Sequence, residues 1–313
     1  MIYNYRELNS TTYLKELQES GLYIDDLTKY KKQLSNIGIF RFKGYVKAFK
    51  SNLSNYSIDD IFNLYKLDNR LKFNLFKIVS ELEIKLKAIL IDIYYKHTDN
   101  PFIYLDKNSY KNSSYITSDM FNSWHTNTKT TKNQEVYLHY KDYYLQKYSF
   151  NKNREFYLNK IELVINSSIN YPPFHYFIED LTLGRVITVL SNLEIDGINI
   201  LKEVANEYGF YQDKLFLSYL LRVKELRNRV AHNARIFNRN YRSVKAINKI
   251  YKKLRADIYE HRLLDVYYSL LILQNQEVNI KNCNDLIESF TKNLLNGCDK
   301  KSIKFAIKYM KKR

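Results

Sequence analysis

Three residues in the last third of the chain, Arg227, Asn228 and His232, could together cleave RNA without a metal ion. An arginine binds two oxygens of one phosphate through its planar guanidinium, and a histidine moves protons near neutral pH. Asn228 could orient the phosphate or the histidine through its amide. RNA carries its own nucleophile, the 2′-hydroxyl, so cleavage needs only proton transfer and a cation that stabilises the phosphorane-like transition state. The expected products end in a 2′,3′-cyclic phosphate.

The spacing of this motif predicts that two copies of the chain act together. Side chains five positions apart on an ideal helix diverge by about 140°, so Arg227 and His232 of one helix do not both point straight at one phosphate. One histidine would also have to serve two proton transfers. The chain has no second arginine followed five positions later by a histidine. We therefore expect a symmetric homodimer in which two motifs face each other.

The segment after the motif carries a regular series of basic residues. Between 227 and 262 the only acids are Asp257 and Glu260. From Arg235 to Lys253, Lys or Arg recurs every three or four positions opposite apolar residues, apart from the adjacent Lys252 and Lys253. This pattern predicts one helix with a buried face and a cationic face about 27 Å long. A helix face that is merely exposed to solvent normally carries both acidic and basic residues, so we expect this cationic face to bind phosphate groups. The alternative is that the face only keeps the protein soluble. The residues expected to bind RNA are Arg229, Arg235, Arg239, Arg242, Lys245, Lys249, Lys252 and Lys253.

Composition favours a helical protein with a polyanionic partner. The 313 residues include only 7 Gly and 3 Pro, too few for the many tight turns of a sheet-rich fold. The net charge of +17 suits RNA. Lys, Asn, Ile and Tyr are abundant, a bias typical of AT-rich genomes that explains part of this charge. The positions of the basic residues along the chain therefore indicate an RNA partner better than the net charge does.

The same composition indicates no cofactor, no metal site and no membrane partner. Cys283 and Cys298 have neither zinc-ligand spacing nor a CxxC redox arrangement, and they are interpreted as reduced thiols. The histidines and acids form no cluster with metal-ligand spacing. The first residues lack a signal-peptide pattern, and no apolar run approaches the 18 or so residues of a membrane span. We expect a cytoplasmic protein.

The elements that position the motif are expected to be helices in three regions. Residues 1–55 form an N-terminal region of two or three short helices, in which 37–45 is an aromatic connection. Residues 56–262 form the main helical domain, which contains a polar insertion at about 98–157 with Trp124, His125 and His139 at its surface. Residues 263–313 form a basic C-terminal extension that ends in a short helix.

Within the main domain, apolar periodicity predicts a long helix over 71–93, preceded by a cap at Ser57 and Asp60. Glu83 and Lys87 have the spacing of an ion pair on this helix. Further helices are expected at 174–181, 185–193 and 198–208, with Gly184 ending or bending the first and Gly209 stopping the last. Another helix should run from 215 into the motif.

Around Arg227, Asn228 and His232 the sequence resembles the Abi-like abortive-infection family of the AbiD and AbiF type, whose core is a HEPN domain. The HEPN signature is an arginine, a polar residue, three variable residues and a histidine. The extended family pattern is matched by Leu226, Arg227, Asn228, Ala231, His232, Arg235, Asn238 and Arg239, with Ile236 and Phe237 in place of Leu and Trp. Family landmarks also occur at 37–45, 64–71, 82–87 and 173–184. The match covers about 14–97 and 170–242.

The resemblance implies an all-α HEPN fold with an N-terminal helical extension. It implies a metal-independent endoribonuclease toxin that acts as a dimer in defence against phage. Some similar proteins are encoded beside a structured noncoding RNA that restrains them. Two alternatives remain open: a HEPN protein that binds RNA without cleaving it, and an interaction module in which the motif only caps a helix. The RNA target, the activation trigger and the role of the insertion remain open too.

Overall fold

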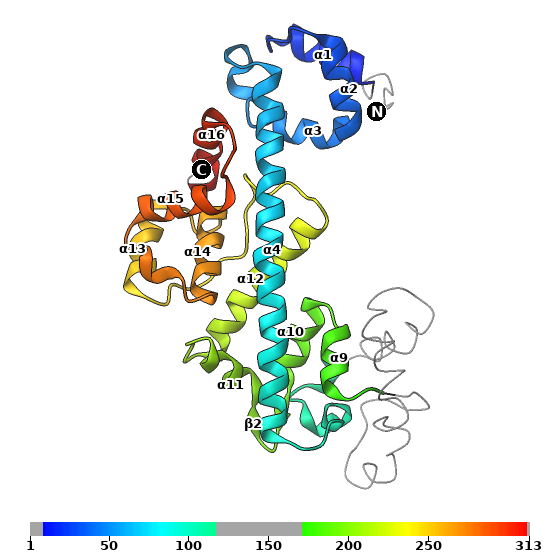
Figure 1. Ribbon diagram of the computed structural model, residues 1–313, viewed down its shortest axis with the longest axis vertical. Helices are drawn as coiled ribbons and strands as arrows, with labels where there is room; N and C mark the ends of the chain where they lie inside the picture. The colour runs from blue at the N-terminus through cyan, green and yellow to red at the C-terminus, as the bar shows by residue number, and fades with distance from the viewer. Residues whose placement is uncertain (1–8, 117–170, 312–313) are drawn as a thin grey trace.

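One long helix organises the molecule. The structure, a computed structural model, describes residues 9–116 and 171–311. Helix α4 (Ile58–His97) has 40 residues and so extends over about 60 Å, with the other helices arranged along it (Figure 1). Its start confirms the predicted cap, because Ser57 and Asp60 form a reciprocal capping box. Its predicted apolar stripe is buried along its length.

The N-terminal helices gather at one end of α4 (Figure 1). They are α1 (Ser10–Glu19), α2 (Leu27–Ile37) and α3 (Ile39–Val46), followed by the 3-10 segment η2 (Lys50–Asn55). The prediction of short helices is confirmed, but 37–45 is not a connection. Gly38, with φ of 84°, separates α2 from α3, and the aromatic residues after it are helical because Phe42 and Tyr45 face the core.

Beyond α4 the chain forms three short 3-10 segments, η3 (Ile103–Leu105), η4 (Lys107–Ser109) and η5 (Ser113–Tyr115). Most of the expected polar insertion, including Trp124, His125 and His139, lies outside the described residues.

The next helices are close to their predicted positions. They are α9 (Phe174–Asp180), α10 (Leu183–Asn192), α11 (Ile200–Glu207) and α12 (Asp213–Ala231), with a small hairpin of β1 (Glu194–Ile195) and β2 (Ile198–Asn199) before α11. Gly209 follows α11 with φ of 76°, as expected for a stop. Gly184 does not end α9; it lies in α10, where a Cβ atom would come within 2.9 Å of Lys224 of α12.

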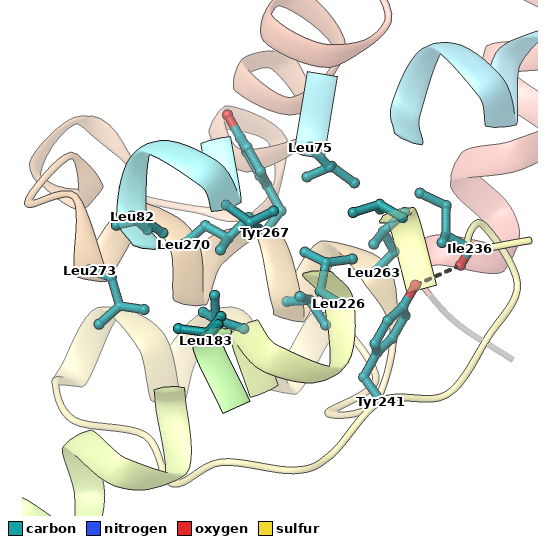
Figure 2. Close-up of a cluster of buried hydrophobic side chains, with 14 of the residues drawn as sticks. Leu75, Leu82, Leu183, Leu226, Ile236, Tyr241, Leu263, Tyr267, Leu270 and Leu273 are labelled. Carbon is teal, nitrogen blue, oxygen red and sulfur yellow. Dashed lines mark hydrogen bonds between the residues drawn. The ribbon is translucent and has the colours of Figure 1, made fainter. Parts of the chain in front are cut away.

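The C-terminal part comprises α13 (Lys249–Asp257), α14 (Leu263–Leu273), η7 (Glu277–Asn279), α15 (Cys283–Leu294) and α16 (Lys300–Lys311). Every residue of α14 is buried, so this helix is hydrophobic on all sides and forms part of the core. Figure 2 shows its leucines packed with Leu75 and Leu82 of α4 and Leu226 of α12. The C-terminal region therefore shares the core of the main helices.

The described residues confirm an all-α fold in which the strands are confined to one short hairpin. In this part of the chain, no helix has both the length and the apolar character needed to cross a membrane.

Candidate functional site

The motif lies where α12 ends. Arg227 is in its last turns, and His232 is the capping residue after Ala231. The next residue, Asn233, adopts a left-handed conformation with φ of 52°, and its N–H donates to Val230 O at 3.1 Å. Ala234 N–H donates to Arg229 O at 2.8 Å. These two bonds satisfy the terminal carbonyls and fix the backbone on both sides of His232.

Arg227 forms an ion pair with α4. Its Nε lies 3.3 Å from Oε2 of Glu83, and both side chains are partly exposed. The expected pairing of Glu83 with Lys87 is wrong: Lys87 is buried and donates instead to the backbone oxygen of Glu179 at 2.8 Å. Glu83 turns toward α12 because the two helices pack together there. The ion pair restricts the guanidinium of Arg227.

The other two motif residues face solvent. Asn228 and His232 are both exposed, so their side chains are open to a ligand as large as RNA. Asn228 also contributes its backbone oxygen, which accepts the N–H of His232 at 3.1 Å. The three motif residues thus share one helix end, with the arginine restrained and the amide and imidazole accessible.

Sequence reasoning missed the residue that anchors the loop after the motif. Asp68 of α4 is fully buried, and its Oδ1 accepts the N–H groups of Ile236 at 3.2 Å and Phe237 at 2.9 Å. Its Oδ2 accepts the hydroxyl of Tyr45 at 2.7 Å. Burial raises the pKa of Asp68, although these donors and nearby Lys72 oppose the shift. Its sequence signal was its place within the family landmark at 64–71, which by itself indicated no anchoring role.

A shallow pocket of about 390 Å³ opens beside His232. It is lined by Asn69, Lys72, Phe73, Phe76, Val230, Ala231 and Asn233. Lys72 donates to the side chain of Asn233, and burial lowers its pKa. Oδ1 of Asn69 is buried and has no hydrogen-bond partner among the described residues. The pocket therefore places the rings of Phe73 and Phe76 next to the motif, whereas the polar atoms of Lys72 and Asn69 lie buried in its wall.

The predicted cationic helix is wrong over most of its length. Residues 234–248 contain no helix. Arg229 belongs to the end of α12, and only Lys249, Lys252 and Lys253 at the other end of the series lie in a later helix, α13. Tertiary partners replace the helical hydrogen bonds. For example, Arg242 N–H donates to Glu225 at 2.9 Å and Lys245 O accepts the hydroxyl of Tyr219 at 2.9 Å.

The basic series divides into inward and outward members. Arg235 turns inward against Gly44 and the ring of Tyr45; its Nε and Nη1 are buried without a hydrogen-bond partner among the described residues, and burial lowers its pKa. Arg229 pairs with Glu225 at 2.9 Å and lies over Tyr241. The remaining members are exposed: Arg239, Arg242, Lys245, Lys249, Lys252 and Lys253.

Arg222, also missed from the sequence, holds the backbone at two points, one within the basic segment and one after it. It is fully buried in α12, pairs with Asp265 of α14 at 2.7 Å and donates to the backbone oxygens of Arg242 at 2.6 Å and Glu260 at 2.8 Å. Five N–H donors in one planar group allow a single side chain to hold all of these. Arg222 therefore shapes the exposed cationic surface without belonging to it.

The described residues contain no group of three or more His, Cys, Asp or Glu side chains that could hold a metal ion. The family model described as Abi-like protein matches residues 32–238, which include the motif and the anchoring residues of α4. No curated protein and no solved structure matches the chain significantly.

Proposed function

Because the chain belongs to the Abi-like protein family, we propose that it is a HEPN-type endoribonuclease toxin that acts in abortive-infection defence against phage. One observation carries this proposal: Arg227, held by Glu83, and the exposed His232 lie at the same helix end. A basic surface adjoins them. This arrangement suits a phosphodiester of RNA, and such an enzyme would meet its substrate in the cytoplasm.

The proposed reaction uses the 2′-hydroxyl of the RNA as nucleophile. His232 takes the proton of that hydroxyl, the 2′-oxygen bonds to phosphorus, and the bond from phosphorus to the 5′-oxygen breaks. A second imidazole gives its proton to the leaving 5′-oxygen. Arg227 stabilises the charge that builds up on the phosphate oxygens. The products are a 2′,3′-cyclic phosphate and a 5′-hydroxyl, and no metal takes part.

The second imidazole would come from the partner subunit's His232 in a homodimer. Two apolar residues on one face of α4 support this pairing, because Phe73 is 71% exposed and Ile84 is 67% exposed. They lie about 20° apart around an ideal helix. Phe73 lines the pocket beside the motif, and Ile84 follows Glu83. Burial of this face between two copies would bring their motifs together.

The exposed cations from Arg239 to Lys253 would bind the RNA backbone. A structured noncoding RNA held on the same surface would cover the motif and restrain the toxin, which is the regulation that the family resemblance suggests. Because Arg235 lies against the ring of Tyr45 and Arg229 pairs with Glu225, they would shape this surface more than they contact phosphate.

RNA binding without cleavage is the second candidate. The ion pair with Glu83 favours it, because a neutralised Arg227 stabilises less charge on a transition state. Under this alternative the protein would sequester RNA, and its motif would contribute only to affinity.

Cleavage of end-labelled RNA in EDTA separates the two candidates. The protein is first stripped of nucleic acid and compared with His232→Ala. Fragments that end in 2′,3′-cyclic phosphate, absent with the variant, support the nuclease. Tight binding by both proteins without any cleavage would support the alternative.

A further inference from the structure

A second cleft lies away from the motif, between α16 and the beginning of α4. Its volume is about 440 Å³, within the range of small-molecule sites. It is lined by Phe49, Tyr56, Asp60, Leu64, Lys301, Ser302, Lys304, Phe305 and Lys308. Leu64 and Phe73 are nine positions apart on α4 and so point about 180° apart on an ideal helix. The cleft therefore opens on the side of α4 opposite the pocket beside His232.

One wall of the cleft is aromatic. The rings of Phe49 and Phe305 stack with centroids 4.4 Å apart and planes only 5° apart. Tyr56 meets Phe49 edge-on at 4.8 Å and Phe305 at 5.9 Å. Phe49 is buried and Tyr309 fixes the neighbouring backbone through a hydrogen bond to Ala48 O at 2.6 Å. The wall is thus formed before any ligand binds.

The rim of the cleft is cationic. Lys301, Lys304 and Lys308 recur at spacings of three and four, so they lie on one face of α16 beside Phe305. Lys301 pairs with Asp60 at 2.6 Å. Lys304 and Lys308 are exposed, and within residues 9–116 and 171–311 neither has an ion pair. Two uncompensated positive charges therefore adjoin a flat apolar wall.

We propose that this cleft binds a nucleotide, with the base against the aromatic wall and the phosphate on Lys304 and Lys308. A base presents a flat π-face, which aromatic side chains recognise in a sequence-tolerant way. The phosphate supplies the anion that the two lysines lack. Neither an apolar ligand without charge nor an inorganic anion would use both parts of the cleft. The ligand is either a free nucleotide or one nucleotide of an RNA strand, and its binding does not require cleavage at His232.

Calorimetric titration with four probes tests the proposal. AMP carries both groups, adenosine lacks the phosphate, inorganic phosphate lacks the base, and a 2′-O-methyl adenosine hexanucleotide represents a strand that cannot be cleaved. We expect AMP or the hexanucleotide to bind at least about tenfold more tightly than adenosine or phosphate. Binding of AMP assigns the site to free nucleotides as well, whereas binding of the hexanucleotide alone assigns it to RNA.

Matched variants locate the binding. Of AMP and the hexanucleotide, we take the probe that binds wild type more tightly. The double variant Lys304→Gln and Lys308→Gln should weaken its binding about tenfold, because two charged contacts are lost. The pair Lys31→Gln and Lys32→Gln removes the same charge from exposed positions of α2 and should change nothing. Equal weakening by both pairs, or tight binding that neither pair affects, would overturn the proposal.

A third variant tests the aromatic wall. Phe305→Leu keeps an apolar side chain but removes the stacked ring, so it should weaken AMP or the hexanucleotide while leaving the affinity for phosphate unchanged. Circular dichroism verifies that this variant is folded; if it is not, the lysine pair still decides. Binding of AMP that is no tighter than that of phosphate would contradict base recognition.

Discussion

The carboxylate of Glu83 holds the guanidinium of Arg227 across the contact between α4 and α12, with Oε2 and Nε 3.3 Å apart. Both side chains are partly exposed, and ion pairs of this kind contribute at most about 1 kcal/mol to stability. The ion pair therefore matters through orientation. It limits the positions that Arg227 can occupy relative to a phosphate near His232.

We expect Glu83→Ala to lower kcat for RNA cleavage about tenfold, because Arg227 loses its orientation. The free energy of unfolding should fall by less than about 1 kcal/mol. The matched control is Glu81→Ala, which removes an exposed carboxylate paired with Lys77 on the same helix. Single-turnover cleavage and urea unfolding measure the two quantities. An unchanged kcat with a large loss of stability would show that the ion pair is structural only.

Asp68→Ala should destabilise the protein by about 3 kcal/mol, because it leaves the N–H groups of Ile236 and Phe237 and the hydroxyl of Tyr45 without their acceptor in the core. Asp68→Asn should cost less, because the amide oxygen can still accept the two N–H bonds. Urea unfolding measures both variants. Equal losses would mean that the charge, not the acceptor, anchors the loop.

The helices were predictable because their signals are local. The stripe of α4, its cap at Ser57 and the stop at Gly209 each depend on residues within a few positions of one another. The motif was found for the same reason, since Arg227 and His232 lie within two helical turns. Its exposure at a helix end follows from the left-handed Asn233, a common helix terminator.

The basic segment was mispredicted because its conformation depends on distant residues. Spacings of three and four fit a helix, yet the backbone of this segment is bonded to Asp68, Tyr219 and Arg222. Asp68 precedes Phe237 by 169 positions, and no local pattern reveals such a partner. Arg235 turns into the protein for the same reason. It lies against Gly44 and Tyr45, which are distant in the sequence, so the regular spacing of the basic residues does not reveal them.

Arg222→Ala should destabilise the protein by about 3 to 5 kcal/mol, because it leaves Asp265 buried without its partner. The double variant Arg222→Met and Asp265→Leu should recover much of this loss in stability, since it removes both charges. RNA affinity should be lower than that of wild type in both the single and the double variant, because the backbone oxygens of Arg242 and Glu260 lose their donor. Urea unfolding and filter binding measure these effects. Full RNA affinity in the double variant would contradict a role of Arg222 in shaping the cationic surface.

Acid should destabilise the protein through His175. Burial lowers the pKa of this imidazole below its usual 6.5. As the pH falls through 6.5, the unfolded chain therefore takes up the proton before the folded chain does, and the free energy of unfolding decreases. Above pH 6.5 this group makes no pH-dependent contribution. His175→Gln should reduce the slope of stability against pH between pH 7.5 and 5.5. Identical slopes in wild type and His175→Gln would refute this assignment.

The apolar face of α4 should hold two copies of the chain together. Ile84→Glu adds a charge to this face without emptying the core, since the residue is 67% exposed. We expect this variant to be monomeric by light scattering at concentrations where wild type is dimeric, and to lose RNA cleavage because a lone His232 cannot perform both proton transfers. The matched control is Phe40→Glu, which places the same charge at a 92% exposed position of α3 and should leave both properties unchanged. A monomeric Ile84→Glu protein that cleaves RNA at the wild-type rate would rule out the two-motif mechanism.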